Sequence, residues 1–294
     1  MRVQSRRAFT LHEMLIALII VGIIGAAFTR VLISQTRFYD KETSLRSARS
    51  IARSATNVLL NDLRMVQDSG GVDSVTADGK LIRILVPYRF GLVCSTNANV
   101  TTVSMLPTDP GTIAYSVYQG FAWRDGTGRY RYVFPSSPTT ADLPVASASP
   151  ADCTGNGAGQ AQIRTVTANG RAGEILDLKS SGGSGAVLGA PVFLWQRITY
   201  SFRTSAAYPN SLGLWRNVQD GVNEELMAPF DASTSFRFYK AGDDTSRVVP
   251  PAVSDIRGLD LVLTAQSPRA VSGNASATTA KVVTSVFFKN LRAF

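Results

Sequence analysis

The sequence predicts an α+β protein with one long N-terminal helix followed by a β-rich head. Two observations carry this prediction. An apolar run from Met14 to Phe28 lies near the start of the chain, and apolar residues recur at helical spacing well beyond it. The remainder consists of short β-patterned runs separated by turns rich in Gly, Ser and Pro. Charged residues make up only 17% of the chain while Ser, Thr, Ala and Gly are abundant, which suits an exported β-rich domain.

The first segment has the length and composition of a membrane span. A bilayer core takes about 20 mostly apolar residues in a helix. Residues 9–29 meet this requirement, and a basic leader over residues 1–8 predicts a cytoplasmic N-terminus and an exported remainder. A cleaved secretory signal is the alternative, with Gly25–Ala27 as its cleavage site. Glu13 does not fit that alternative, because an acidic side chain at the start of a hydrophobic core is costly and is normally paired or functional.

The residues around this acid carry a resemblance. They run Ala8-Phe9-Thr10-Leu11-His12-Glu13-Met14-Leu15. This motif resembles the class III signal of type IV prepilins and type II secretion pseudopilins. The resemblance implies that a membrane prepilin peptidase cuts between Ala8 and Phe9 and methylates the new N-terminus at Phe9. Two positions depart from the family pattern. Ala8 stands where the family usually has Gly, and His12 fills a variable position that is more often apolar.

The resemblance also implies a role for Glu13 and a division of the chain. In this family the acidic residue pairs with the N-terminal amine of a neighbouring subunit and sets the register of a filament. The alternative is that Glu13 only reaches the membrane interface. The expected segments are a removed leader over 1–8, a transmembrane and filament-core segment over 9–29, an amphipathic continuation of the helix over 30–68, and an exported head over 69–294.

Helical spacing continues beyond the membrane segment. The apolar stripe comprises Leu45, Ala48, Ala52, Ala55, Leu59, Leu63 and Val66, widened by Ile51, Val58 and Met65. The opposite, polar face comprises Arg46, Arg49, Arg53, Asn57 and Asp62. Because no proline precedes Pro87, we expect one helix from Phe9 to about Gln67. Such a helix is about 85–90 Å long, and Ser69–Gly71 ends it.

The head is expected to consist of short strands. The candidates are 80–86, 112–118, 129–134, 163–166, 174–178, 192–202, 213–216, 225–230, 235–239, 256–263 and 282–288. A loop-rich insertion around 135–160 is rich in Ser, Pro, Ala and Gly. Residues 180–185 form a Gly/Ser loop that lacks the Gly-Lys-Ser/Thr ending of a phosphate-binding loop.

The last third carries a second resemblance, which is one of pattern. An aromatic strand at 198–202 precedes a Leu-Trp-Arg strand at 214–216. An aromatic strand with an acidic turn and an Ile-x-Gly-Leu-x-Leu-x-Leu run at 256–263 then follow. This order resembles the J-type pseudopilins of type II secretion and the PilW-like minor pilins. The two resemblances cover the first helix and the last third of the chain and leave the middle unassigned.

Cys94 and Cys153 are the only cysteines. In an oxidising compartment such a pair usually forms a disulfide. The bond would tie the loop-rich insertion to the head and contribute about 3–4 kcal/mol in the loop-entropy model. Two free, buried thiols are the alternative. The spacing excludes a CxxC redox or zinc motif.

Few residues suit catalysis or metal binding. His12 is the only histidine and lies in the membrane segment, which excludes histidine-based triads and zinc sites with several histidines. Asp243 and Asp244 could ligate calcium, although two adjacent acids in a turn are more often only solvated. We expect no catalytic residue, cofactor or metal. The formal net charge of +9 could attract DNA, but no basic cluster is interleaved with aromatic residues, so no nucleic-acid partner is expected.

These features and the resemblance predict a minor, non-enzymatic structural subunit of a type IV pilus. Its expected partners are the prepilin peptidase, the inner membrane, and other pilins or pseudopilins that contact its N-terminal helix. It would first span the inner membrane once, with its head in the periplasm or exterior, and then join a filament. A J-type pseudopilin of a type II secretion system is the close alternative. A signal-anchored exported enzyme or binding protein is the alternative from another class.

Overall fold

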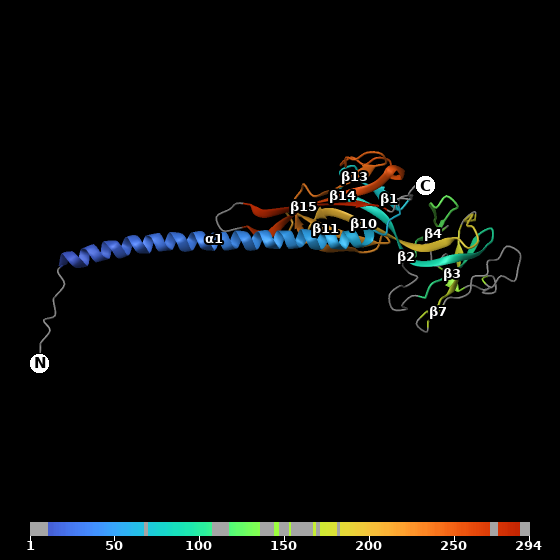
Figure 1. The fold of residues 1–294 in the computed structure, drawn as a ribbon, viewed down its shortest axis with the longest axis horizontal. Helices are drawn as coiled ribbons and strands as arrows, with labels where there is room; N and C mark the ends of the chain where they lie inside the picture. The colour runs from blue at the N-terminus through green and yellow to red at the C-terminus, as the bar shows by residue number, and fades with distance from the viewer. Residues whose placement is uncertain are drawn as a thin grey trace.

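The computed structural model describes residues 11–67, 70–107, 118–135, 144–146, 153, 167–168, 171–180, 183–270 and 276–288. In this part of the chain, the long helix α1 (Leu11–Leu63) precedes an antiparallel β-sheet head. The helix has 53 residues, which corresponds to about 80 Å. Its second half lies along the sheet while its first half extends away from the head (Figure 1). The α+β prediction is therefore confirmed.

Thirteen strands of the described ranges form one sheet. They are β1 (Val72–Val75), β2 (Leu81–Thr96), β3 (Val100–Met105), β4 (Gly120–Arg124), β5 (Tyr130–Val133), β6 (Val145–Ala146), β9 (Ile175–Lys179), β10 (Pro191–Thr204), β11 (Leu212–Val218), β12 (Asn223–Phe230), β13 (Ser235–Lys240), β14 (Ile256–Ala270) and β15 (Ala277–Phe287). Their order is β13-β14-β12-β11-β10-β2-β3-β9-β6, with β1 beside β2, β15 beside β14, and β4 beside both β10 and β5. A short 3₁₀ helix, η4 (Val253–Asp255), precedes β14, and β7 (Thr167–Ala168) pairs separately with β8 (Arg171–Ala172).

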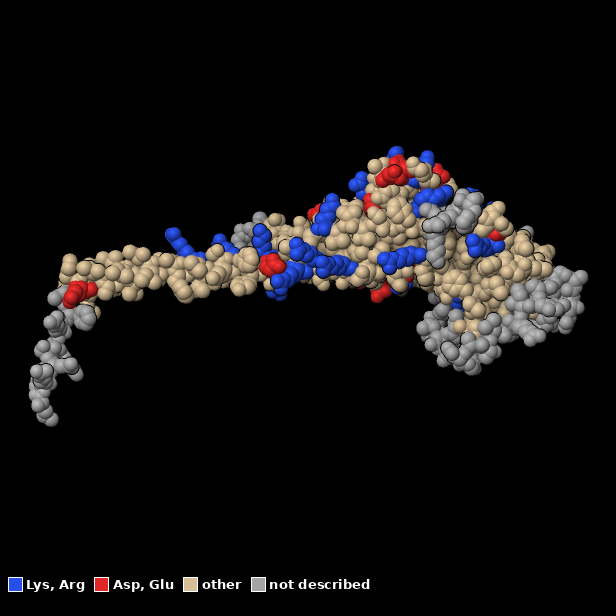
Figure 2. Space-filling view, viewed as in Figure 1, with Lys and Arg blue, Asp and Glu red and all other residues tan. Residues whose placement is uncertain are grey.

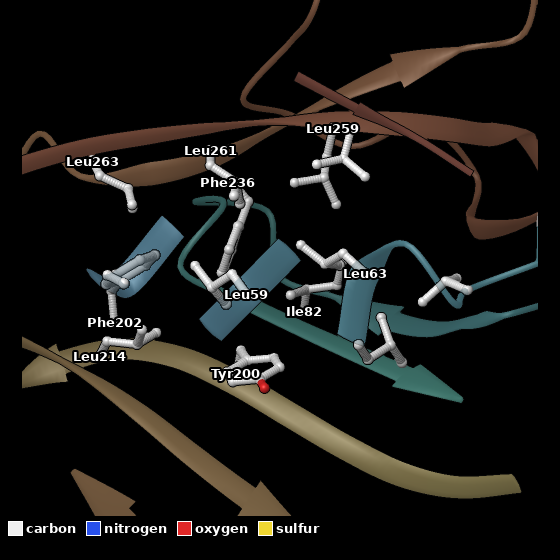
Figure 3. Packing of buried hydrophobic residues seen from close by; sticks show 14 of the residues in the cluster. Leu59, Leu63, Ile82, Tyr200, Phe202, Leu214, Phe236, Leu259, Leu261 and Leu263 are labelled. Carbon is white, nitrogen blue, oxygen red and sulfur yellow. The ribbon is translucent and has the colours of Figure 1, made fainter. Parts of the chain in front are cut away.

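The second half of α1 packs its apolar stripe against the sheet. Its fully buried apolar residues are Ala48, Ala52, Ala55, Leu59 and Leu63, and Val66, just beyond the helix, is fully buried too. Figure 3 shows Leu59 and Leu63 lying among side chains of β2, β10, β13 and β14. The centre of the stripe predicted from the sequence is thus the buried face. Leu45, Ile51 and Val58 are only half-buried, and Met65 is exposed. The small side chains at three of the buried positions let the helix lie close to the strands.

The head continues beyond the C-terminal end of α1 as a second lobe, here called the distal lobe (Figure 1). The long strands β2 and β10 run through both lobes, and β3, β4, β5, β6 and β9 are added at their far ends. A separate apolar core fills the distal lobe. Its larger buried side chains are Val93, Val103, Met105, Tyr118, Phe121, Trp123, Leu176, Leu178, Val192 and Leu194. The described head therefore has two large cores that share β2 and β10, and a smaller third cluster of Leu85, Ala122, Phe193 and Trp195.

Helix α1 ends at Leu63, four residues before the expected end at Gln67. The backbone N–H groups of Met65 and Val66 donate to the carbonyls of Asp62 and Leu63, three residues earlier. This tightening of the last turn ends the regular i→i−4 ladder. The amphipathic helical segment expected over 30–68 is thus shorter than expected.

The strand predictions match the last third of the chain most closely. The last six expected strands correspond to β10 to β15 in order, and those at 129–134 and 174–178 correspond to β5 and β9. Strands β1, β3, β4, β6, β7 and β8 were not expected, and β6 lies within the expected loop-rich insertion. Almost all of the expected strand at 112–118, the whole of that at 163–166 and most of the insertion around 135–160 lie outside the described residues.

The expected strand at 80–86 continues through Pro87 to Thr96 as β2. Proline cannot donate a ladder hydrogen bond and is tolerated within a sheet at bulges. The register between β2 and β10 shifts at this point, because Leu194 pairs with Arg89 and the next residue, Trp195, pairs with Pro87. The irregular register explains why the proline does not end the strand.

Candidate functional site on the projecting half of α1

The first half of α1 exposes apolar side chains on every side. Residues 11–41, here called the projecting half, are exposed throughout, and Leu18 is 70% exposed. Its large apolar side chains are Leu11, Met14, Leu15, Ile16, Leu18, Ile19, Ile20, Val21, Ile23, Ile24, Phe28, Val31, Leu32, Ile33, Phe38 and Tyr39. A helix that is apolar all round is normally covered by lipid or by other protein. The projecting half is therefore a surface that requires a partner or a membrane.

The length of the apolar part fits a bilayer. Leu11 to Thr29 comprises nineteen residues, which rise about 28 Å in a helix. This matches a hydrocarbon core of about 30 Å. By length and composition, this one helix of the described chain could cross a membrane.

The processing residues expected from the sequence lie at the start of this helix. Ala8 and Phe9 fall outside the described residues. Glu13 lies in the first turn of α1 and is exposed to solvent. A carboxylate in a first turn interacts favourably with the positive end of the helix dipole. The acid is thus held near the tip of the apolar helix, at the end remote from the head.

A buried polar contact holds the second half of α1, residues 42–63 and here called the docked half, against the head. The expectation that Asp62 lies on the solvent face is wrong. Asp62 is 8% exposed, and its Oδ2 accepts a hydrogen bond from Tyr200 Oη at 2.6 Å. Nη2 of Arg216 lies 3.6 Å from the same oxygen. Burial, and then the neighbouring carboxylate, raise the pKa of Tyr200 well above its ordinary value, so the phenol keeps its proton and donates. The contact ties the last turn of α1 to β10 and β11.

The structure joins Cys94 to Cys153 by a disulfide, as expected from the sequence. Cys94 lies in β2, both residues are fully buried, and they are 59 positions apart in the chain. The bond therefore fixes position 153, which belongs to the loop-rich insertion, to a strand that runs through both lobes. Its place in the distal lobe makes it a structural crosslink remote from the projecting half.

The acidic turn at Asp243 is explained by its own hydrogen bonds. Its Oδ1 accepts from the backbone N–H and the hydroxyl of Thr245, and its Oδ2 accepts from Arg247. These bonds, the Thr245 hydroxyl first, lower the pKa of Asp243. Within the described residues, no group of three His, Cys, Asp or Glu side chains could hold a metal ion. The turn is accounted for without a cation.

Comparisons with known proteins add no relative: no protein-family model, no curated protein and no solved structure matches the chain. The site consists of an exposed apolar half of α1, with Glu13 near its tip, and of a second half of α1 that packs against the sheet. Chemically, this arrangement can anchor the head and offer a long surface for packing against other helices.

Proposed function

We propose that the chain is a minor, non-enzymatic structural subunit of a type IV pilus. One observation carries the proposal. The same uninterrupted helix is exposed and apolar in its first half and packed against the head in its second half. A rigid connection of this kind transmits the position of the packed apolar segment to the head. A flexible linker between an anchor and a soluble domain would not.

The energetics favour a helix that moves from lipid into a protein array. Each large apolar side chain stabilises by about 1.5–3 kcal/mol when it leaves water. Sixteen such side chains are exposed on the projecting half, so covering them is worth about 25–50 kcal/mol. Before assembly the bilayer covers the eleven of them that lie within Leu11–Thr29. In a filament, parallel helices of neighbouring subunits would also cover those beyond Thr29.

Glu13 gives the packing a register. A carboxylate inside an apolar array is costly unless it meets a positive partner. Cleavage after Ala8 would create an amine at Phe9, and methylation keeps that amine positive. We assign the amine of a neighbouring subunit as the partner of Glu13, so that each new subunit is added at one height. The prepilin peptidase is the partner that creates this amine.

The shape of the head supports a low-abundance position. The distal lobe extends the head beyond the end of α1 (Figure 1), and a bulky head crowds a helical array in which it repeats. We therefore place the subunit near a filament tip. A J-type pseudopilin of a type II secretion system is the second candidate, because the second resemblance, carried by the sequences of β10, β11, β13 and β14, is to both groups.

Mass spectrometry of sheared surface filaments tests the proposal. The wild-type strain should yield filaments that contain the chain at a small fraction of the major subunit. Deletion should reduce piliation and leave type II secretion intact. If deletion blocks secretion and spares piliation, the second candidate is correct. If the chain occurs in neither filament, both filament functions are wrong.

A further inference from the structure

Two adjoining hollows flank the docked half of α1. The first lies between α1 and β12, and its lining includes Ile51, Tyr208, Leu226 and Met227. The second lies on α1 itself, and its lining includes Arg46, Arg49 and Arg53. Ser50 and Ser54 line both hollows. They are therefore two parts, one mostly apolar and one basic, of a single α1–β12 groove.

The one acidic residue among the described residues that line the groove is Glu225, in its apolar part, and Glu225 Oε2 accepts a hydrogen bond from the backbone N–H of Ala206 at 3.0 Å. Arg46 pairs with Glu42 at 3.1 Å, but the ion pairs of the described residues include none at Arg49 or Arg53. From Arg30 to Arg53 the helix carries six basic and two acidic residues. Figure 2 shows Lys and Arg side chains gathered along α1 between its apolar end and the head. This face attracts a negatively charged surface.

We propose that the α1–β12 groove binds an amphipathic, acidic helix of a different exported subunit. Carboxylates of that helix pair with Arg49 and Arg53, and its apolar side chains contact Leu226 and Met227. Arginine and carboxylate form charge-assisted, often bidentate pairs, and the i, i+3, i+7 spacing of the three arginines matches carboxylates at the same spacing on a helix parallel to α1.

This inference rests on the proposed function. When apolar segments pack side by side, helices of neighbouring subunits run along α1 on the faces that its own head leaves open. The groove lies on such a face, because it is lined by exposed residues of α1, including Arg49 and Arg53, next to β12. The occupant is therefore a helix that is already held parallel to α1.

Other occupants fit less well. A second copy would bring the same arginines and the same excess of basic residues against this face. Lipid headgroups lie too far away, because Arg49 is twenty residues beyond Thr29, or about 30 Å, and charges in physiological salt are screened within about 8 Å. Single-stranded nucleic acid prefers a basic groove with several stacking aromatic rings along it, whereas Tyr208 is the one aromatic residue among the described residues that line this groove.

Site-specific photocrosslinking in living cells tests the proposal on the full chain. A photoreactive residue replaces Ser54 in the groove, and a control chain carries it at Thr279 on the exposed face of β15. Crosslinked peptides are identified by mass spectrometry from whole cells. The double variant Arg49→Glu with Arg53→Glu is compared with Arg269→Glu with Lys281→Glu, which makes the same charge change on β14 and β15.

The expected adduct at position 54 is an acidic helical segment of another exported subunit. Its yield should fall at least tenfold in the groove variant, stay unchanged in the matched control, and return when lysines replace the acids of the identified segment. The milder Arg49→Gln with Arg53→Gln variant should give an intermediate loss. A crosslinked peptide from this chain itself, a nuclease-sensitive adduct, a yield insensitive to the arginines, or no adduct would each overturn the inference.

Failure of the inference is distinguishable from failure of the proposed function. If the wild-type chain is present in filaments and the groove variant enters them equally without a charge-dependent adduct, only the groove assignment is wrong. If the wild-type chain is absent from filaments, the proposed function is wrong. The whole-cell adduct then still decides the groove assignment by its sequence and by its dependence on the arginines.

Discussion

Replacement of Leu59 by Ala measures how much the packing of α1 against the head contributes to the free energy of unfolding. Leu59 is fully buried in the docked half. Figure 3 shows it surrounded by side chains from several strands, including Tyr200 and Phe236. The substitution removes three carbon atoms from the centre of this core and leaves a space that strands on both sides cannot easily fill.

The expected loss follows from that burial. At about 0.8 kcal/mol for each buried methylene-sized group, the lost transfer free energy is about 2.4 kcal/mol. Incomplete collapse of the cavity adds to it, which brings the total to about 3–4 kcal/mol. A domain is typically stable by about 5–15 kcal/mol, so the loss is a large share of the total.

Leu18→Ala is the matched control on the same helix. The chemical change is identical, but Leu18 lies in the projecting half, is 70% exposed and touches no part of the head. Its effect on the unfolding of the head should stay below about 0.5 kcal/mol. Both variants are unfolded with urea as the full chain in detergent micelles, with tryptophan fluorescence as the signal, since all three tryptophans belong to the head.

Two results would refute the reasoning. A shift below about 1 kcal/mol for Leu59→Ala would mean that this side chain is not packed as described. An equal shift for Leu18→Ala would mean that the projecting half contributes to the folding of the head. A change in the urea m-value would show that the substitution altered the cooperative unit, and the midpoint shift would then not measure the contact.

Three further predictions test separate features. Tyr200→Phe should cost about 1–3 kcal/mol, because the Asp62 carboxylate stays buried without its hydroxyl donor. The folded-state pKa of Tyr200 lies above its ordinary value of 10.0. The stability that the neutral phenol contributes is therefore fully present below pH 10.0 and is lost as the pH rises above it. Tyr200→Phe should remove this alkaline loss of stability, measured by urea unfolding at pH values on both sides of 10.0. Replacing Cys94 and Cys153 by Ser opens a loop closed across 59 positions and should lower the unfolding free energy of the oxidised chain by about 4 kcal/mol, while a reductant should affect only the wild type. Glu13→Lys should abolish recovery of the chain in sheared filaments, and Glu13→Gln should only reduce it, as quantified by immunoblot. If both variants are recovered as well as the wild type, the alternative that Glu13 only reaches the membrane interface is supported.

Helical periodicity was the most informative sequence signal. It identified the buried stripe, because burial on one face of a helix depends on spacing that is local in the chain. Asp62 was placed on the polar face because it is charged, yet it lies three residues after Leu59 and seven after Ala55, so its spacing puts it beside the buried stripe. Its burial depends on Tyr200 and Arg216, which come from strands far along the chain. No pattern within the helix encodes that pairing.

The strands of the head were less predictable than the helix. Those of the last third alternate clearly and are bounded by turns, so β10 to β15 were expected in order. Strand β3 (Val100–Met105) consists largely of Thr, Ser and Val, and all but its first residue are buried, so it shows no alternation to detect. Its burial follows from pairing on both sides, with β2 and β9. The α1–β12 groove was also beyond prediction, because it joins residues of α1 to a strand from the last third.

The mass of the N-terminal peptide of the chain, isolated from sheared filaments, tests the central claim most directly. A pilus subunit of this kind should have a mature chain that begins at Phe9, carries one methyl group on its amine and lacks residues 1–8. An N-terminal peptide that retains Met1 to Ala8, or one that begins after Gly25–Ala27, would contradict it. The first result would indicate a plain signal anchor, and the second a cleaved secretory signal.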